Sequence, residues 1–132
     1  MQRIVRTGSF TLPAAAVAAM RLFTAEGERA WAPGWDPIGD DDCWRTEAHG
    51  HTTYWLAVDR TPTSARYARV TPGDTAGTVA VTCTDEGDRT RVTVTYDLTA
   101  IGPAGEERLA GFDSGYDEML LEWQRLTTPL CS

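Results

Sequence analysis

The chain has 132 residues, of which 42% are hydrophobic and 23% charged, and 19 acidic against 12 basic residues give a formal net charge of −7. This composition is typical of a globular protein, and the length favours one domain over residues 1–132 with a core of its own. The acidic balance argues against general binding to nucleic acid, which needs a surface rich in lysine and arginine, and against an anionic membrane surface as partner.

The three cysteines, Cys43, Cys83 and Cys131, form no C-x-x-C pair, and their odd number leaves at least one thiol free. A reducing compartment, the cytoplasm, is therefore predicted. The stretch LPAAAVAAM resembles the apolar part of a signal peptide, but Pro13 interrupts it and a predicted strand precedes it. No apolar segment approaches the roughly 20 residues that span a bilayer, so we predict no membrane insertion.

The N-terminal third combines a strand with short helices. Residues 2–12, QRIVRTGSFTL, alternate loosely and predict a first strand. Pro13 and the run AAAVAAMRLF that follows it predict a short helix of about ten residues, since proline is favoured in the first turn and alanine is a strong helix former. Residues 26–31 are a candidate for a second short helix, which Pro33 and Gly34 would end.

From Cys43 to Ile101 the pattern is that of β-strands. Tyr96 belongs to the clearest alternation, in which apolar residues at 92, 94, 96 and 98 are separated by polar ones, as in an antiparallel sheet with one solvated face. For residues 52–59 the inward face stays open, because Trp55 with its neighbours two residues away competes with the set that contains Tyr54. Turn residues separate five strand-like runs: WRTEAHG, TTYWLAVD, ARYARVTPG, GTVAVTCTD and RTRVTVTYDLTAI.

The last segment has helical periodicity, which predicts one long amphipathic helix over about residues 105–128, on the order of 33 Å long. Its apolar residues step by three and four: Leu109, Phe112, Tyr116, Met119, Trp123, Leu126 and Leu130. A twisted antiparallel sheet must cover its apolar face, and this helix is the largest element that can do so. The predicted fold is therefore α+β: a curved antiparallel sheet of about six strands wrapped around a long C-terminal helix, with one or two short helices after the first strand.

Five stretches of the chain resemble the START/polyketide-cyclase-like superfamily (SRPBCC), and in particular its small single-domain bacterial members. They are GERAWAPGW, the T-x-x-W of residues 52–55, YARVTPG at 67–73, TRVTVTYDLTAIGPAG at 90–105 and YDEMLLEW at 116–123. The resemblance spans residues 4–127. It implies the helix-grip fold and a cavity between sheet and helix, but no catalytic motif that can be transferred to particular residues, since members of this fold bind lipids, cyclise polyketides or assist chaperones.

Ten residues are candidates for the wall of this cavity, because ligand sites are concave and mostly apolar with a few polar groups. They are Trp31, Trp35, Trp55, Tyr67, Arg69, Val94, Tyr96, Tyr116, Met119 and Trp123. Trp31 and Trp35 could close the cavity mouth, with Glu28 or Asp36 as a polar fixture, or pack under the sheet edge; we favour packing. Arg69 is equally well placed on the inner or the solvated face.

Other chemistry finds little support in the sequence. His49 and His51, with Cys43 upstream, match no established zinc spacing, so neither a metal nor another cofactor is predicted. No nucleophile motif and no phosphate-binding glycine loop is present.

Three hypotheses for the function therefore remain. The first is binding of a small hydrophobic or amphipathic ligand by a monomer or homodimer. The second is an enzyme of the polyketide cyclase, aromatase or dehydratase type that uses acid–base groups in the same cavity. The third is a chaperone-assisting or interaction module with an exposed apolar patch, for which the segment 31–35 is a candidate.

Overall fold

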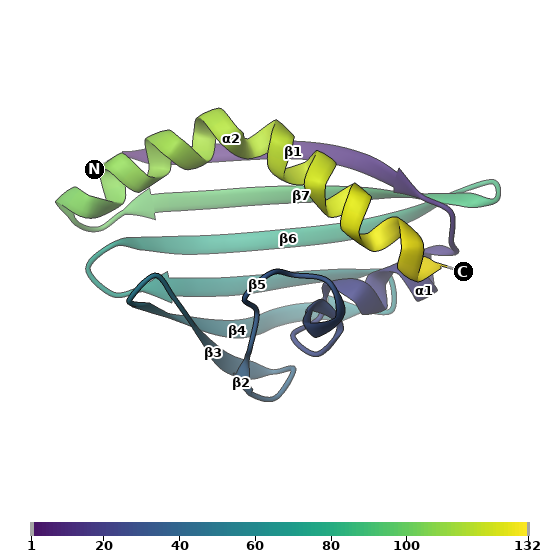
Figure 1. Cartoon of the computed structure of the whole chain (residues 1–132), viewed down its shortest axis with the longest axis horizontal. Coiled ribbons are helices and arrows are strands. Elements are labelled where there is room, and N and C mark those ends of the chain that lie inside the picture. The colour runs from purple at the N-terminus through teal and green to yellow at the C-terminus, as the bar shows by residue number, and fades with distance from the viewer. Residues whose placement is uncertain (1, 132) are drawn as a thin grey trace.

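The computed structural model describes residues 2–131, which form one strand, a group of short helices, six further strands and one long helix (Figure 1). This is the predicted order. The strands are β1 (Arg3–Leu12), β2 (Ile38–Gly39), β3 (Cys43–Ala48), β4 (His51–Thr61), β5 (Ser64–Thr71), β6 (Thr75–Glu86) and β7 (Arg89–Ala100). The helices are α1 (Ala16–Met20), α2 (Pro103–Thr127) and the short 3₁₀ helices η1 (Arg21–Phe23), η2 (Gly27–Ala30) and η3 (Thr128–Cys131).

The seven strands form one antiparallel sheet in the order β1-β7-β6-β5-β4-β3-β2. Gly50, Gly73 and Gly87 lie at the hairpin turns with φ values of 79°, 75° and 67°, a region that residues with a Cβ rarely adopt. β1 pairs with β7 along its whole length, so the first and last strands are neighbours. The strand beyond the predicted count of about six is β2, a two-residue strand at the sheet edge.

Helix α2 packs across β1 and β7 (Figure 1), and near its C-terminal end Trp123 stacks on Phe23 of η1. Pro103 occupies the start of the helix, where its missing N–H has no cost, and Gly102 is the N-cap. Tyr116 is fully buried against the sheet. The observed range, 103–127, agrees with the predicted one. Leu130, which we predicted to continue the apolar stripe, is exposed because the α-helix ends before it and η3 follows.

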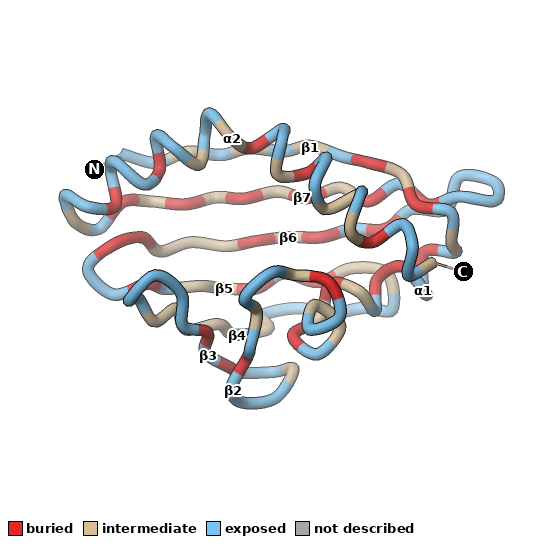
Figure 2. Tube along the Cα trace, in the orientation of Figure 1, coloured by how far each residue is buried: buried red, intermediate tan, exposed pale blue. Residues whose placement is uncertain are grey.

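The core lies between the sheet and the helices. Buried and more exposed residues alternate along β6 and β7, as the red segments of these strands in Figure 2 show. On β4, Trp55 is half-buried on the inner face, which settles the alternative that the sequence left open. The outer face of β4 presents Tyr54, Leu56 and Val58, each about half exposed at 53%, 51% and 50%.

Gly77 allows β6 and β7 to approach closely. It lies opposite Arg69 of β5 and Leu98 of β7, and a Cβ atom on it would overlap the carbonyl oxygen of Asp97. We expect Gly77→Ala to lower the free energy of unfolding by about 2–3 kcal/mol, because the two backbones must move apart to accept the methyl group. Urea denaturation measures this change.

A matched control is Gly111→Ala on α2, where no atom lies within 4 Å of the added Cβ. The free energy of unfolding of this variant is expected to rise by up to about 1 kcal/mol, because alanine has a higher helix propensity than glycine. Equal stability of Gly77→Ala and the unaltered protein would show that the strands accept a side chain here, contrary to the clash expected with the Asp97 carbonyl.

Candidate functional site

A small cavity lies between the sheet and α2, with a volume of about 20 Å³, room for about one water molecule. Aromatic rings fill most of the space that the curved sheet leaves, so a larger ligand requires some of these side chains to move. Of the ten predicted wall residues, Trp55, Tyr67, Tyr96 and Trp123 line this cavity. The complete lining is Phe23, Glu28, Trp44, Trp55, Tyr67, Val79, Val81, Tyr96 and Trp123.

The other six predicted residues lie around this lining. Val94 and Tyr116 are buried where β7 meets α2, and Met119 is half-buried on the same helix. Trp31 is buried with its ring centroid 5.4 Å from that of Trp123, and Trp35 is 5.5 Å from Trp55. Arg69 lies over the Trp55 ring, with its Cζ 5.0 Å from the ring centroid.

The indoles of Trp31 and Trp35 anchor the segment that follows α1. The Trp31 N–H donates to the Leu22 carbonyl at 2.7 Å, and the Trp35 N–H donates to the Ala25 carbonyl at 2.8 Å. Their rings pack in T-shaped contacts on the cavity residues Trp123 and Trp55, while their N–H groups hold the backbone. The segment 31–35 therefore does not present the exposed apolar patch that we considered for it.

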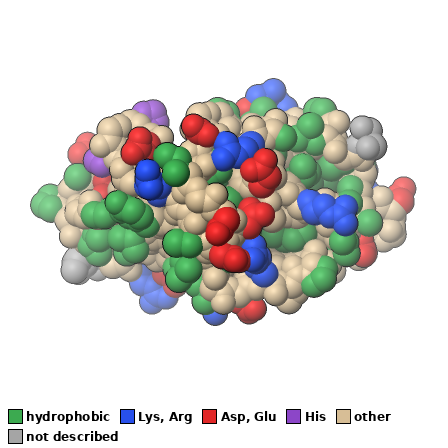
Figure 3. All heavy atoms as spheres, turned by 90° about the horizontal axis from the view of Figure 1, so that it is seen from below, with side chains coloured by type: hydrophobic (Ala, Val, Ile, Leu, Met, Phe, Trp, Pro, Cys, Tyr) green, Lys and Arg blue, Asp and Glu red, His purple; other side chains and the backbone are tan. Residues whose placement is uncertain are grey.

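Exposed apolar side chains lie instead on the outer face of β4 and β5, where Tyr54, Leu56, Val58 and Val70 are at least 40% exposed. Figure 3 views the molecule from the side of β2 and β4 and shows hydrophobic side chains gathered near the two histidines. His49 and His51 lie at the exposed turn between β3 and β4. Among residues 2–131, no group of three histidines, cysteines or carboxylates is placed to hold a metal ion.

Two of the three inner tyrosines use their hydroxyl groups to hold the fold. Tyr67 donates to the Phe23 carbonyl at 2.9 Å, and Tyr116 donates to the Val94 carbonyl at 2.5 Å. Burial raises the pKa of both phenols, that of Tyr116 to about 12. The hydroxyl of Tyr96 takes part in no hydrogen bond within the described chain, and burial raises its pKa as well. Tyr96 is therefore the tyrosine whose hydroxyl is free for a ligand.

Glu28 brings a carboxyl group into this aromatic lining. Burial raises the pKa of the carboxyl to about 8, and no hydrogen bond or cation within residues 2–131 opposes this shift. At neutral pH the group is therefore mostly a neutral acid that can donate a hydrogen bond. The sequence analysis named Glu28 as a polar fixture but not as a wall residue. Its spacing of three from Trp31 would have placed both on one face of a short helix.

Trp44 is another of the wall residues that the sequence analysis did not name; Phe23, Val79 and Val81 are the others besides Glu28. Its ring stacks on that of Trp55, with centroids 5.9 Å apart and planes at 4°. The indole N–H is buried without a hydrogen-bond partner among the described residues. Such donors are rare in folded proteins and commonly mark a site for water or a ligand.

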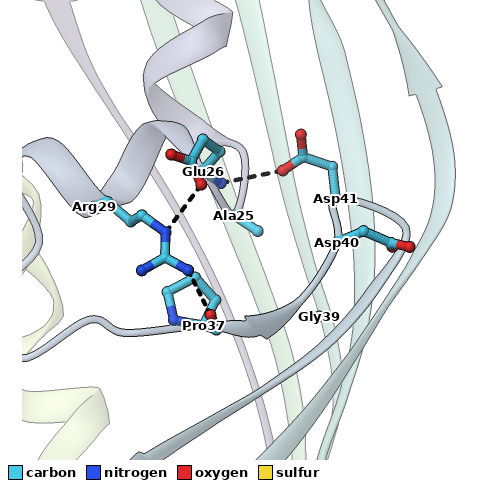
Figure 4. A pocket seen from close by; sticks show the side chains of 7 residues that line it. All are labelled: Ala25, Glu26, Arg29, Pro37, Gly39, Asp40 and Asp41. Atoms are coloured by element: carbon cyan, nitrogen blue, oxygen red, sulfur yellow. Dashed lines mark hydrogen bonds and ion pairs between the residues drawn. The ribbon is translucent and has the colours of Figure 1, made fainter.

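A charged cluster outside the cavity holds η2, and with it Glu28, in place. Arg29 donates to the Glu26 carboxylate at 2.9 Å and to the Pro37 carbonyl at 2.6 Å, and Asp41 accepts from the backbone N–H of Glu26 (Figure 4). Arg29 also donates to the Asp36 carboxylate at 2.8 Å. Figure 3 shows acidic and basic side chains next to one another on this side of the molecule. The open depression among these residues is polar. Arg29 pairs with Glu26, and Asp40 and Asp41 accept from backbone N–H groups, so these side chains position η2 and the adjoining loop.

No protein-family model and no curated protein sequence matches the chain. Solved structures resemble it in fold. CalU16 from Micromonospora echinospora is 15% identical with a TM-score of 0.67, covering 98% of this chain and 88% of that one. The Aha1 dimer from Colwellia psychrerythraea is 12% identical with a TM-score of 0.67, covering 92% and 93%. DynU16, from the dynemicin biosynthetic locus, is 18% identical with a TM-score of 0.65, covering 92% and 46%.

At these identities the similarity concerns the fold alone: an α+β helix-grip arrangement of a seven-stranded antiparallel sheet and a long C-terminal helix. No helix among residues 2–131 is long and apolar enough to cross a membrane.

Proposed function

We propose that the protein binds a small amphipathic molecule between the sheet and α2, with the carboxyl group of Glu28 as a polar contact. The observation that carries this proposal is a carboxyl group without a partner in a wall that is otherwise aromatic or aliphatic. Glu28 is half-buried, and a carboxyl group that loses part of its water without gaining a hydrogen bond raises the free energy of the folded state. A ligand that forms this hydrogen bond would recover part of that cost, together with the free energy of its own apolar burial.

The fold similarity to CalU16 and DynU16 supports this proposal and our assignment of the chain to the SRPBCC superfamily as one helix-grip domain over residues 1–132. The unpaired thiols of Cys43, Cys83 and Cys131 support the cytoplasm as its compartment. The protein acts as a monomer or a homodimer in this proposal, and the fold similarity to a dimeric protein is compatible with the latter.

Native mass spectrometry of freshly purified protein tests the proposal. We expect a reproducible additional mass that is lost on denaturation, and we expect Trp123→Ala to lower its occupancy at least about tenfold, since this indole lines the cavity. Leu121→Ala, at an exposed position of the same helix, is the control and should retain the mass. A melting curve identifies a variant that fails to fold, in which case Trp123→Phe replaces it. A native mass equal to that of the bare chain would contradict the proposal.

A second candidate function is acid–base catalysis on a carbonyl compound of the polyketide type. It is favoured by the Glu28 pKa of about 8, because a general base or acid works best when its pKa lies near the working pH. The free hydroxyl of Tyr96 lines the same cavity and could polarise a carbonyl oxygen. If this function applies, Glu28→Gln abolishes turnover of a bound carbonyl compound while leaving its binding largely intact.

A further inference from the structure

Arg69 lies on β5 two residues after the cavity residue Tyr67, so both side chains point to the inner face of the sheet. Trp55 of β4 is its neighbour across the sheet on one side and Gly77 of β6 on the other. The guanidinium group stacks on the Trp55 ring, which stacks in turn on Trp44. The Cζ atom of Arg69 lies 5.0 Å from the centroid of the Trp55 ring, a cation–π contact that favours this position of the guanidinium group.

The guanidinium group of Arg69 has no anionic partner. Its Nε is buried and without a hydrogen-bond acceptor in residues 2–131, and no ion pair of the described chain includes it. The buried carboxylate of Asp74 is already bound by Arg108, whose Nε donates to both of its oxygens at 2.8–2.9 Å. Burial lowers the pKa of Arg69, so the cation is held where solvent compensates it poorly.

The neighbour of Arg69 on β6, Gly77, brings no side chain over the guanidinium group. This residue faces inward next to Arg69, has no side chain, and cannot be replaced by a larger residue without a clash with the β7 backbone. A guanidinium edge with two parallel N–H groups matches the two oxygens of a carboxylate. Tyr96 and Glu28 line the cavity itself, together with Trp55, over whose ring the Arg69 guanidinium group lies.

We infer that Arg69 forms an anion subsite next to the cavity and that the ligand carries a carboxylate group, bound through the Nε edge of the guanidinium group stacked on Trp55. This inference rests on the proposed function and specifies its ligand class as an aromatic or alkyl carboxylic acid. The nearby carboxylate of Asp74 is neutralised by Arg108, so the cation of Arg69 is left to attract an anion in a protein with a net charge of −7.

Two matched pairs of probes test this inference by titration calorimetry: 2-naphthoate with 2-naphthamide, and decanoate with decanamide. The unaltered protein should bind the acid of at least one pair about tenfold or more tightly than the amide, as a charge-assisted pair of hydrogen bonds predicts. Arg69→Met keeps the length of the side chain and its contact with Trp55 but removes the charge. It should lower the affinity for the acid at least about tenfold and leave that for the amide within about twofold.

Arg66→Met is the control, since Arg66 lies on the same strand but on the exposed outer face. This variant should leave both affinities unchanged. The melting temperature of Arg69→Met should equal or exceed that of the unaltered protein, because an unpaired buried charge is removed.

The anion subsite and the binding function can fail separately. If acid and amide bind equally and Arg69→Met changes neither affinity, the anion subsite is refuted while ligand binding stands. The subsite is likewise refuted if Arg66→Met weakens binding of the acid as much as Arg69→Met does. If none of the four probes binds, the proposed binding function fails, and the subsite with it.

Discussion

The free energy of unfolding of the unaltered protein is expected to fall as the pH rises from about 4.5 to about 8, and that of Glu28→Gln is expected not to show this fall. Below pH 4.5 the carboxyl is protonated in the folded and the unfolded chain. Above it the unfolded chain releases the proton while the folded chain keeps it up to about pH 8. The folded state then binds more protons, so the free energy of unfolding falls as the pH rises through this window.

The size of this loss follows from the pKa difference. Each pKa unit corresponds to about 1.4 kcal/mol, and Glu28 keeps some contact with solvent, so we expect a loss of about 3 kcal/mol across the window. Glutamine has nearly the same shape and no charge, and Glu28→Gln should therefore be the more stable protein at pH 8 and nearly equal to the unaltered protein at pH 4.

Urea denaturation at pH values from 4 to 9 measures this difference. Glu118→Gln, which removes the same charge from an exposed position of α2, is the control and should follow the unaltered protein at each pH. A difference between Glu28→Gln and the unaltered protein that does not change with pH would mean that the carboxyl is solvated in the folded state. The proposed polar contact in the cavity would then lose its basis.

Replacing Phe23 with alanine is expected to lower the free energy of unfolding by about 3–5 kcal/mol. The Phe23 side chain is 1% exposed, and its ring lies 5.7 Å from that of Trp31 and 6.1 Å from that of Trp123. Few neighbours can move into the vacated space, because the Trp31 indole is held by its hydrogen bond to the Leu22 carbonyl and Tyr67 is held by its hydrogen bond to the Phe23 carbonyl. The existing cavity should therefore enlarge by most of the volume of the phenyl ring.

This enlargement gives the prediction a second readout. Benzene at millimolar concentration should raise the melting temperature of Phe23→Ala and leave that of the unaltered protein unchanged, as for any ligand that binds only the folded state. Phe112→Ala is the control: this half-buried ring of α2 packs on Tyr96 at 4.8 Å but does not line the cavity. Phe112→Ala should lower the free energy of unfolding less than Phe23→Ala does, and benzene should not raise its melting temperature. Equal stabilisation of both variants would show that the two rings do not differ in their relation to the cavity.

The elements of the fold could be predicted from local pattern. Alternation over residues 89–100 predicts a strand with one buried face, and steps of three and four after Leu109 predict a helix of the observed length. The aromatic residues Tyr67, Tyr96 and Trp123 could be assigned to the interior because large apolar surfaces are buried wherever a core exists.

The polar part of the site could not be predicted in this way. Both faces of residues 52–59 carry aromatic or aliphatic side chains, so only the pairing of β4 with β5 decides that Trp55 points inward and stacks with Arg69. Glu28 enters the wall because Arg29 ties η2 to a loop near β2, a contact between segments that no periodicity records.

Local pattern is thus enough to identify the strands, the helices and the rings of the core, since these depend on backbone propensity and on the burial of apolar area. Contacts between distant segments establish which polar groups face the cavity and which of them lack partners. Local sequence pattern does not predict the surroundings of a carboxyl or guanidinium group, because these surroundings are set by distant segments that the fold brings around it.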